Sequence, residues 1–105
     1  MTDKESIKIK LSQLKNNYLS CGIEIIGIFG SVAKGINDNF SDIDIAYKLN
    51  KNIFFNKYKD GFSQILKLEE IKQELEKELN NRVDFVNISP NKELQKDISK
   101  DMLYV

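Results

Sequence analysis

The stretch that decides the fold covers residues 23–47 and reads IEIIGIFGSVAKGINDNFSDIDIAY. Its first part, Ile23 to Phe29, is short and rich in β-branched residues, which predicts a buried strand. Gly30-Ser31 follows directly, and Val32 to Gly35 is predicted to form a short helical turn with Ser31 as its N-cap. Asp42 to Tyr47 begins by alternating acidic and apolar residues, which predicts a second strand.

Further helices and a third strand are expected on both sides of this stretch. The predicted elements are a helix from Asp3 to Leu19, a polar loop from Ile36 to Ser41, a helix from Phe62 to Leu79, a strand from Arg82 to Ile88 and a helix from Lys92 to Lys100. The apolar stripe of the long helix consists of Ile65, Leu68, Ile71, Leu75 and Leu79. Since helices and strands alternate, we expect a mixed α/β fold of two layers. A chain of 105 residues is expected to form one domain, residues 1–105.

Two apolar segments are open to two interpretations. The segment Ile53, Phe54, Phe55, together with Tyr58, either closes the core of the domain or offers a docking surface to a partner. Its conformation is not decided by its pattern, and burial in the domain's own core is the commoner use of such residues. The C-terminal segment 102–105 either packs back on the sheet or reaches a partner.

The composition excludes several kinds of chemistry. The sequence has no histidine, which rules out Ser-His-Asp and Cys-His catalysis and leaves zinc without its usual ligands. Any metal would therefore be held by oxygen, as magnesium, manganese and calcium are. Cys21 is the only cysteine, so no internal disulfide can form and a reducing compartment is expected. The sequence shows no signal peptide and no apolar run long enough to span a bilayer, so we expect a cytoplasmic protein.

Asp42 and Asp44 are the first candidate site residues. Residues two apart on a strand point to the same face, so the two carboxylates would project side by side while Ile43 and Ile45 face the core. Such a pair concentrates negative charge, which a divalent ion relieves. Carboxylates on rigid strands hold the two metal ions of phosphoryl-transfer sites about 3.5–4 Å apart. Taken alone, the pair is more often the solvated face of an edge strand.

Gly30 and Ser31 are the second candidate feature. A glycine after a buried strand, followed by a hydroxyl at a helix start, leaves backbone N–H groups that suit phosphate oxygens. Taken alone, this feature is more often an ordinary turn with a serine cap. Gly30 and Asp42 lie close enough in sequence for neighbouring strands to bring both features together. A site for a metal-bound triphosphate needs both parts.

The two motifs together resemble a known family. The runs Gly30-Ser31-Val32-Ala33-Lys34-Gly35 and Ser41-Asp42-Ile43-Asp44-Ile45 are similar to the signature of the nucleotidyltransferase superfamily related to DNA polymerase beta. The similarity is strongest to its minimal nucleotidyltransferase branch and extends over nearly the whole chain. The resemblance implies a DNA polymerase beta-like fold, with a small mixed sheet and helices packed on it.

The resemblance also implies a role for each site residue. Asp42 and Asp44 would bind two Mg²⁺ ions, with Asp44 bridging both. Asp84, in the run 82–86, fits the position of a third carboxylate that completes one metal site and activates the acceptor hydroxyl, by metal ligation or as a general base. The Gly30-Ser31 amides and the Ser31 hydroxyl would hold the terminal phosphates of ATP.

Two basic residues near the motifs have less defined roles. Lys34 stands where the family usually has arginine, so it keeps the charge but lacks the planar fork that grips phosphate. Lys34 and Gly35, at the end of the same glycine-rich turn, are expected to take part in binding the nucleotide with Gly30 and Ser31. Arg82 lies two residues before Asp84 and either neutralises phosphate charge or, as is commoner, forms a surface salt bridge.

The resemblance implies an antitoxin that acts on a partner protein. Such a protein transfers AMP from ATP to a tyrosine of a HEPN-type ribonuclease toxin and releases pyrophosphate, in a complex with that toxin. Two alternatives remain: neutralisation of a toxin by binding and occlusion, and transfer to a small-molecule acceptor. The 16 basic residues balance 16 acidic ones, so we expect no direct nucleic-acid partner, and no membrane partner is expected.

Overall fold

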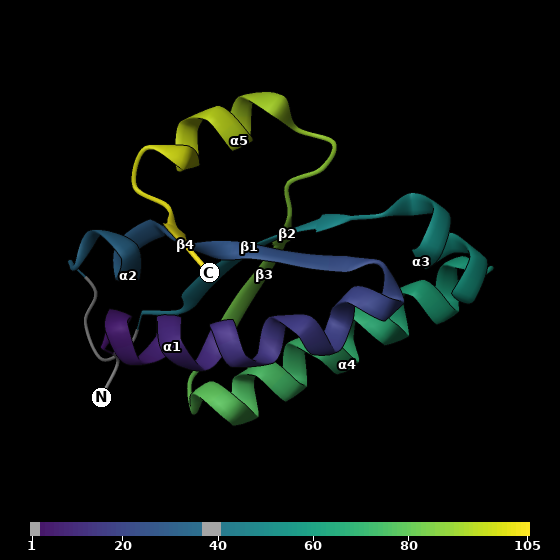
Figure 1. Cartoon of the computed structure of the whole chain (residues 1–105), viewed down its shortest axis with the longest axis horizontal. Helices are drawn as coiled ribbons and strands as arrows, with labels where there is room; N and C mark the ends of the chain where they lie inside the picture. The colour runs from purple at the N-terminus through teal and green to yellow at the C-terminus, as the bar shows by residue number, and fades with distance from the viewer. Residues whose placement is uncertain (1–2, 37–40) are drawn as a thin grey trace.

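The fold is built on a single sheet, with a layer of helices packed on one face and a further helix on the other face (Figure 1). The computed structural model of the chain describes residues 3–36 and 41–105. In chain order, the elements are α1 (Lys4–Leu14), the 3₁₀ helix η1 (Lys15–Cys21), β1 (Ile23–Phe29), α2 (Gly30–Lys34), β2 (Ile43–Leu49), α3 (Lys51–Lys57), α4 (Gly61–Leu79), β3 (Val83–Asn87), α5 (Lys92–Ser99) and β4 (Leu103–Tyr104). In Figure 1, α1 and α4 lie below the sheet and α5 lies above it.

The sheet is mixed, with strand order β3-β2-β1-β4. β2 runs antiparallel to β1 and parallel to β3, and β4 runs antiparallel to β1. The parallel pair requires a crossover between β2 and β3, which α3 and α4 supply. The mixed α/β fold predicted from the sequence is therefore confirmed.

The main core lies between the sheet and the layer of α1 and α4. β2 contributes Ile43 and Ile45, both fully buried, as their alternation with the aspartates predicts. The fully buried side chains that surround them are Leu11, Ile23, Ile28, Val32, Phe54, Ile71 and Leu75. Burying one such side chain contributes about 1.5–3 kcal/mol to the stability of the fold. The strand that carries Asp44 is therefore fixed by its packing on the side of α1 and α4.

The predicted first helix is wrong in its second half. The α-helix ends at Leu14 and continues as the 3₁₀ helix η1 to Cys21. A 3₁₀ winding aligns residues three apart, and Tyr18 and Cys21 are both buried on one side of it. Leu19, the last residue of the predicted helix, is left 48% exposed.

The predicted stripe of the long helix is also wrong at one position. Ile71 and Leu75 are fully buried, and Leu68 and Leu79 pack on the core at its edge. Ile65, however, is 68% exposed. The first turns of α4 extend past the end of the strands (Figure 1), so the sheet offers nothing for Ile65 to pack against.

The structure shows where the residues of the two apolar segments lie. The segment 53–55 is helical, and Phe54 is buried in the core, where its ring lies edge-on to Phe55 and tilted against Tyr58. Ile53 and Phe55 remain partly exposed. The C-terminal segment packs back on the sheet, since its residues form β4 against the end of β1.

Candidate active site

Asp44 and Asp84 occupy paired positions on adjacent parallel strands. In the register of β2 and β3, Asp44 lies opposite Asp84, and on its other side Asp44 lies opposite Phe29 of β1. Paired residues share a face of the sheet, and the neighbouring Ile43 and Ile45 point into the core. Both carboxylates therefore project from the face opposite α1 and α4, next to the end of β1.

This arrangement makes the charged form of Asp44 unfavourable. The pKa of Asp44 is raised from 3.8 to about 6. The causes are burial, the negative charges of Asp84 and Asp42, and a hydrogen bond with Asp84. The desolvation is the largest of these causes. A carboxylate in this state takes up either a proton or a cation. Perturbed carboxylates of this kind concentrate at functional sites.

Gly30 brings the glycine-rich turn directly against Asp44. Its φ is +74°, in the left-handed region that favours glycine. A Cβ at this position would collide with the Asp44 carboxylate, at 3.0 Å from Cγ and 3.4 Å from Cβ, with Oδ2 closer still. Only glycine fits here. The predicted meeting of the turn and the carboxylates is therefore present, although the residues are 14 positions apart in the sequence.

The prediction of Ser31 as an N-cap is wrong. Phe29 is the N-cap residue of α2, no side-chain hydrogen bond caps this helix, and Ser31 lies within its first turn. The reason is the left-handed backbone of Gly30, which lets the helix begin directly after β1 ends at Phe29, so that its N-cap lies two residues earlier than predicted. Gly35 ends α2 in a left-handed conformation, and its N–H donates to carbonyl oxygens of the same short helix.

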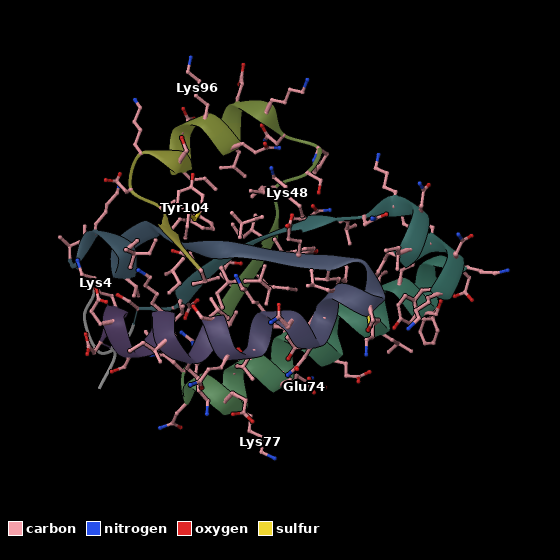
Figure 2. All side chains as sticks on the ribbon, in the orientation of Figure 1. Lys4, Lys48, Glu74, Lys77, Lys96 and Tyr104 are labelled. Atoms are coloured by element: carbon pink, nitrogen blue, oxygen red, sulfur yellow. The ribbon has the colours of Figure 1, made fainter. Side chains whose placement is uncertain are left out.

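The cations near the turn come from different parts of the chain. Lys34 lies in the last turn of α2 and is exposed. Lys4, from the start of α1, also lies beside α2 (Figure 2), and its Nζ is 4.0 Å from the position that a Cβ of Gly35 would occupy. Lys4 could not be predicted from the sequence, since nothing in its local pattern places α1 beside this turn.

Asp42 lies just before β2 and pairs with a different group. Its Oδ1 is 3.2 Å from Nε of Arg82, which lies just before β3. Of the two predicted uses of Arg82, the structure shows the surface salt bridge. Within residues 3–36 and 41–105, no three Asp, Glu, His or Cys side chains are gathered closely enough to hold a metal ion. The structure thus brings Asp44 and Asp84 together, while Asp42 is turned toward Arg82.

The donor set nevertheless fits an oxygen-ligated divalent ion. Asp44 and Asp84 supply carboxylate oxygens from adjacent strands, and the pKa of Asp44 is raised by burial first and by the neighbouring negative charges second, both of which a bound cation would offset. Magnesium and manganese prefer such ligands. Asp42 would complete the set on releasing Arg82. Residues 37–40 of the predicted loop lie outside the described residues.

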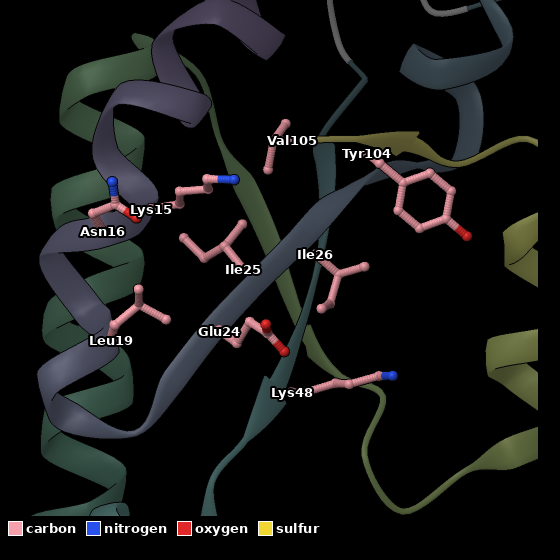
Figure 3. A pocket seen from close by; sticks show the side chains of 9 residues that line it. All are labelled: Lys15, Asn16, Leu19, Glu24, Ile25, Ile26, Lys48, Tyr104 and Val105. Atoms are coloured by element: carbon pink, nitrogen blue, oxygen red, sulfur yellow. The ribbon is translucent and has the colours of Figure 1, made fainter.

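A hollow of about 340 Å³ lies elsewhere on the sheet (Figure 3). It is formed by η1, β1, β2 and the C-terminal segment, and its lining side chains are Lys15, Asn16, Leu19, Glu24, Ile25, Ile26, Lys48, Tyr104 and Val105. Neither the paired aspartates nor the Gly30 turn contributes to it. A second hollow, of about 430 Å³, adjoins it at the start of β1. The carboxylates and these hollows are therefore separate features of the surface.

Comparison with known proteins shows the family to which the chain belongs. The family described as "Polymerase beta, Nucleotidyltransferase" matches residues 7–104. This chain is a member of the polymerase beta nucleotidyltransferase family. MJ1379 of Methanocaldococcus jannaschii, provisionally named a protein adenylyltransferase, is 33% identical over 104 residues, which cover 97% of this chain and 93% of that protein.

A solved structure supports the fold of this nucleotidyltransferase. It is described provisionally as a minimal nucleotidyltransferase and superposes with a TM-score of 0.71, covering 98% of this chain and 96% of its own. At 21% identity, this likeness concerns the fold, and it confirms the polymerase beta-like fold that the motifs implied. In the described part of the nucleotidyltransferase, no helix is long and apolar enough to cross a membrane.

Proposed function

We propose that this nucleotidyltransferase transfers AMP from ATP to a tyrosine hydroxyl of a partner protein, in the presence of Mg²⁺. The observation that carries the proposal is the pairing of Asp44 with Asp84, with the backbone of Gly30 packed against Asp44. It places a glycine-rich turn, suited to phosphate, beside carboxylates, suited to a divalent ion. The name of the M. jannaschii relative, which specifies a protein acceptor, supports the adenylyl group and the class of acceptor.

In the proposed reaction, the acceptor hydroxyl attacks the α-phosphorus of ATP. A new phosphorus–oxygen bond forms, the bond between the α-phosphorus and the bridging oxygen breaks, and pyrophosphate leaves. Asp84 is the more exposed of the paired carboxylates and accepts the proton of the hydroxyl. Gly30 and Ser31 hold the terminal phosphates, with Lys34 as a nearby positive charge.

Asp42, Asp44 and Asp84 would hold the divalent ions, two by analogy with other phosphoryl-transfer sites. When bound, Mg²⁺ neutralises charge on the phosphates. The chain's own contribution is rigid placement: Asp44 is fixed between β1 and β3, so its carboxylate cannot move far from the turn. This rigidity supports a catalytic role for Asp44 over that of a solvated surface group.

We further propose that the acceptor is a HEPN-type toxin and that this protein acts as its antitoxin in the cytoplasm, in a hetero-oligomer. An exposed apolar surface supports a protein partner. It lies on α3 and the first turns of α4 and consists of Ile53, Phe55, Phe62, Ile65 and Leu66, which we call the α3–α4 surface. Phe62, Ile65 and Leu66 lie three and four residues apart and so share one face of α4, and exposed apolar faces of this kind mark sites of protein association.

The test is incubation of the protein with Mg²⁺, the product of the neighbouring gene and ATP labelled at either the α- or the γ-phosphate. We expect label from the α-phosphate on the partner and none from the γ-phosphate. Asp44→Asn should abolish labelling. Asp97→Asn, which removes the same charge from an exposed position on α5, should leave it intact. No labelling by the folded wild-type protein would contradict the proposal.

The same variants separate chemistry from occlusion. If Asp44→Asn still neutralises the toxin in cells as well as the wild-type protein does, binding alone suffices and the enzymatic role is wrong. If neutralisation disappears with labelling, while the complex still forms, the transfer itself is the protective step.

A further inference from the structure

Asp42 and Arg82 form a second row beside the paired aspartates. Ile43 pairs with Val83 in the parallel ladder, and the Ile43 N–H donates to the carbonyl of Arg82 over 2.9 Å. Asp42 is two residues before Asp44, and Arg82 is two residues before Asp84. Both rows are therefore expected on the same face, about 6.6 Å apart along the strands.

The Asp42–Arg82 ion pair competes directly with the metal site. Oδ1 of Asp42 lies 3.2 Å from Nε of Arg82, so the ion pair occupies a carboxylate oxygen that a metal ion would need. Within the described residues, no group of three metal-ligating side chains is assembled. Asp42 has to leave Arg82 before it can join Asp44 and Asp84.

The ion pair is weak enough to be exchanged. The Arg82 side chain is 78% exposed and that of Asp42 is 45% exposed, and water screens pairs of this kind strongly. Arginine has five N–H donors in a planar fork, and the planar fork matches the oxygens of a phosphate group. Its position one row from Asp44 keeps it within reach of a triphosphate lying on the turn.

We propose that Arg82 is a positioning residue that holds Asp42 away from the metal site until the triphosphate arrives. Its guanidinium then exchanges Asp42 for the phosphate oxygens of the triphosphate. This inference rests on the proposed function and specifies how the site is assembled. Metal and nucleotide then bind cooperatively, because each removes one partner of the ion pair. Without nucleotide, the site holds metal poorly.

The first measurement is Mn²⁺ binding to the protein alone, followed by the electron paramagnetic resonance of free Mn²⁺. Arg82→Gln should bind Mn²⁺ about 3- to 10-fold more tightly than the wild-type protein, since Asp42 is released. Arg82→Lys keeps the charge and should bind close to wild type. Lys48→Gln removes a positive charge four residues along β2 from Asp44 and serves as the matched control, with unchanged affinity.

The second measurement is binding of α,β-methylene-ATP at saturating Mn²⁺. Here Arg82→Gln should bind about 5- to 20-fold more weakly, since the fork is lost, and Arg82→Lys should recover part of the loss. If Arg82 had a merely structural role, its replacement could not strengthen the binding of Mn²⁺ and at the same time weaken the binding of the nucleotide. In an Asp42→Asn background, Arg82→Gln should no longer tighten Mn²⁺ binding.

Each outcome decides the inference. Mn²⁺ affinity that is unchanged or lowered in Arg82→Gln overturns the role of Arg82 while leaving the proposed function standing, provided that Asp44→Asn abolishes Mn²⁺ binding. If neither the wild-type protein nor Arg82→Gln binds Mn²⁺, both the inference and the metal-dependent function are wrong.

Discussion

Asp44 on β2 and Asp84 on β3 lie opposite each other in the parallel register, and the Asp84 carboxylate disfavours the charged form of Asp44. The strands that hold them are fixed by the core below, so the two groups cannot separate to relieve the repulsion. The same rigidity that prepares the site for a cation therefore costs the folded protein stability. Such a cost is expected where a site is built for function.

Asp44→Asn should stabilise the fold at neutral pH. The folded-state pKa of Asp44 is raised to about 6 from 3.8, so the penalty is fully present above about pH 6 and disappears as the pH falls below the unfolded value. Allowing for solvent screening of this half-buried group, we expect a gain of about 1–2 kcal/mol at pH 7.5 and about half of that at pH 5. Urea unfolding at both pH values measures it.

The control for this prediction is Asp97→Asn, which should change the free energy of unfolding by less than about 0.5 kcal/mol at either pH. A loss of stability in Asp44→Asn at pH 7.5 would show that Asp44 is stabilised, and not strained, by its surroundings.

Gly30→Ala should damage both the fold and the site. The left-handed φ of +74° costs an L-residue about 1–2 kcal/mol, and the new Cβ would displace the Asp44 carboxylate. We expect a loss of about 1–3 kcal/mol in thermal or urea unfolding, together with loss of AMP transfer.

Gly61→Ala provides the matched control for Gly30. Gly61 opens α4, its φ is not in the left-handed region, and nothing lies within 4 Å of a Cβ there. This substitution should stabilise the protein by about 0.4–1 kcal/mol and leave transfer unchanged. Equal effects of the two alanines would refute the close approach of Gly30 to Asp44.

Ser31→Ala should weaken nucleotide binding without weakening the fold. Ser31 makes no capping hydrogen bond in α2, so its hydroxyl contributes little to stability. If it holds a phosphate oxygen, its loss should raise the Kd for ATP about 3- to 10-fold, as expected for one hydrogen bond to a charged group. Calorimetric titration with ATP and Mg²⁺ measures this.

Ser12→Ala is the comparison for Ser31. It removes a 2.8 Å hydrogen bond to the carbonyl of Lys8 within α1 and should leave the Kd for ATP unchanged. A wild-type Kd for Ser31→Ala would remove Ser31 from the phosphate site.

Ile65→Ser should weaken binding of the partner protein. Ile65 is 68% exposed, so the change should alter the free energy of unfolding by less than about 0.5 kcal/mol. If the α3–α4 surface binds the partner, we expect about a 10-fold or greater rise in Kd, measured by biolayer interferometry.

Ile9→Ser is the matched variant, since Ile9 is 60% exposed on α1, outside that surface. It should bind the partner as the wild-type protein does. Weakened binding by Ile9→Ser alone would move the docking surface to α1.

Local patterns were sufficient for most of the elements. The strand Ile23–Phe29 has the bounds that its β-branched run predicts, and the long helix begins one residue earlier than expected. Patterns of this kind depend on neighbours in the chain, which the sequence states directly. β4 was not predicted, because a strand of two residues has no periodicity and exists only through its pairing with β1.

For the candidate site, too, one part followed from the sequence and another only from the tertiary structure. The sequence by itself determined the chemistry: with no histidine, any metal must be held by oxygen, and Asp42, Asp44 and Asp84 are the carboxylates that its motifs single out. Only the tertiary structure decided how they are arranged, with Asp44 beside Asp84 and Gly30, and Asp42 beside Arg82. The reason is physical: side-chain identity is local, whereas desolvation, register and the choice of ion-pair partner depend on which distant strands come to lie side by side.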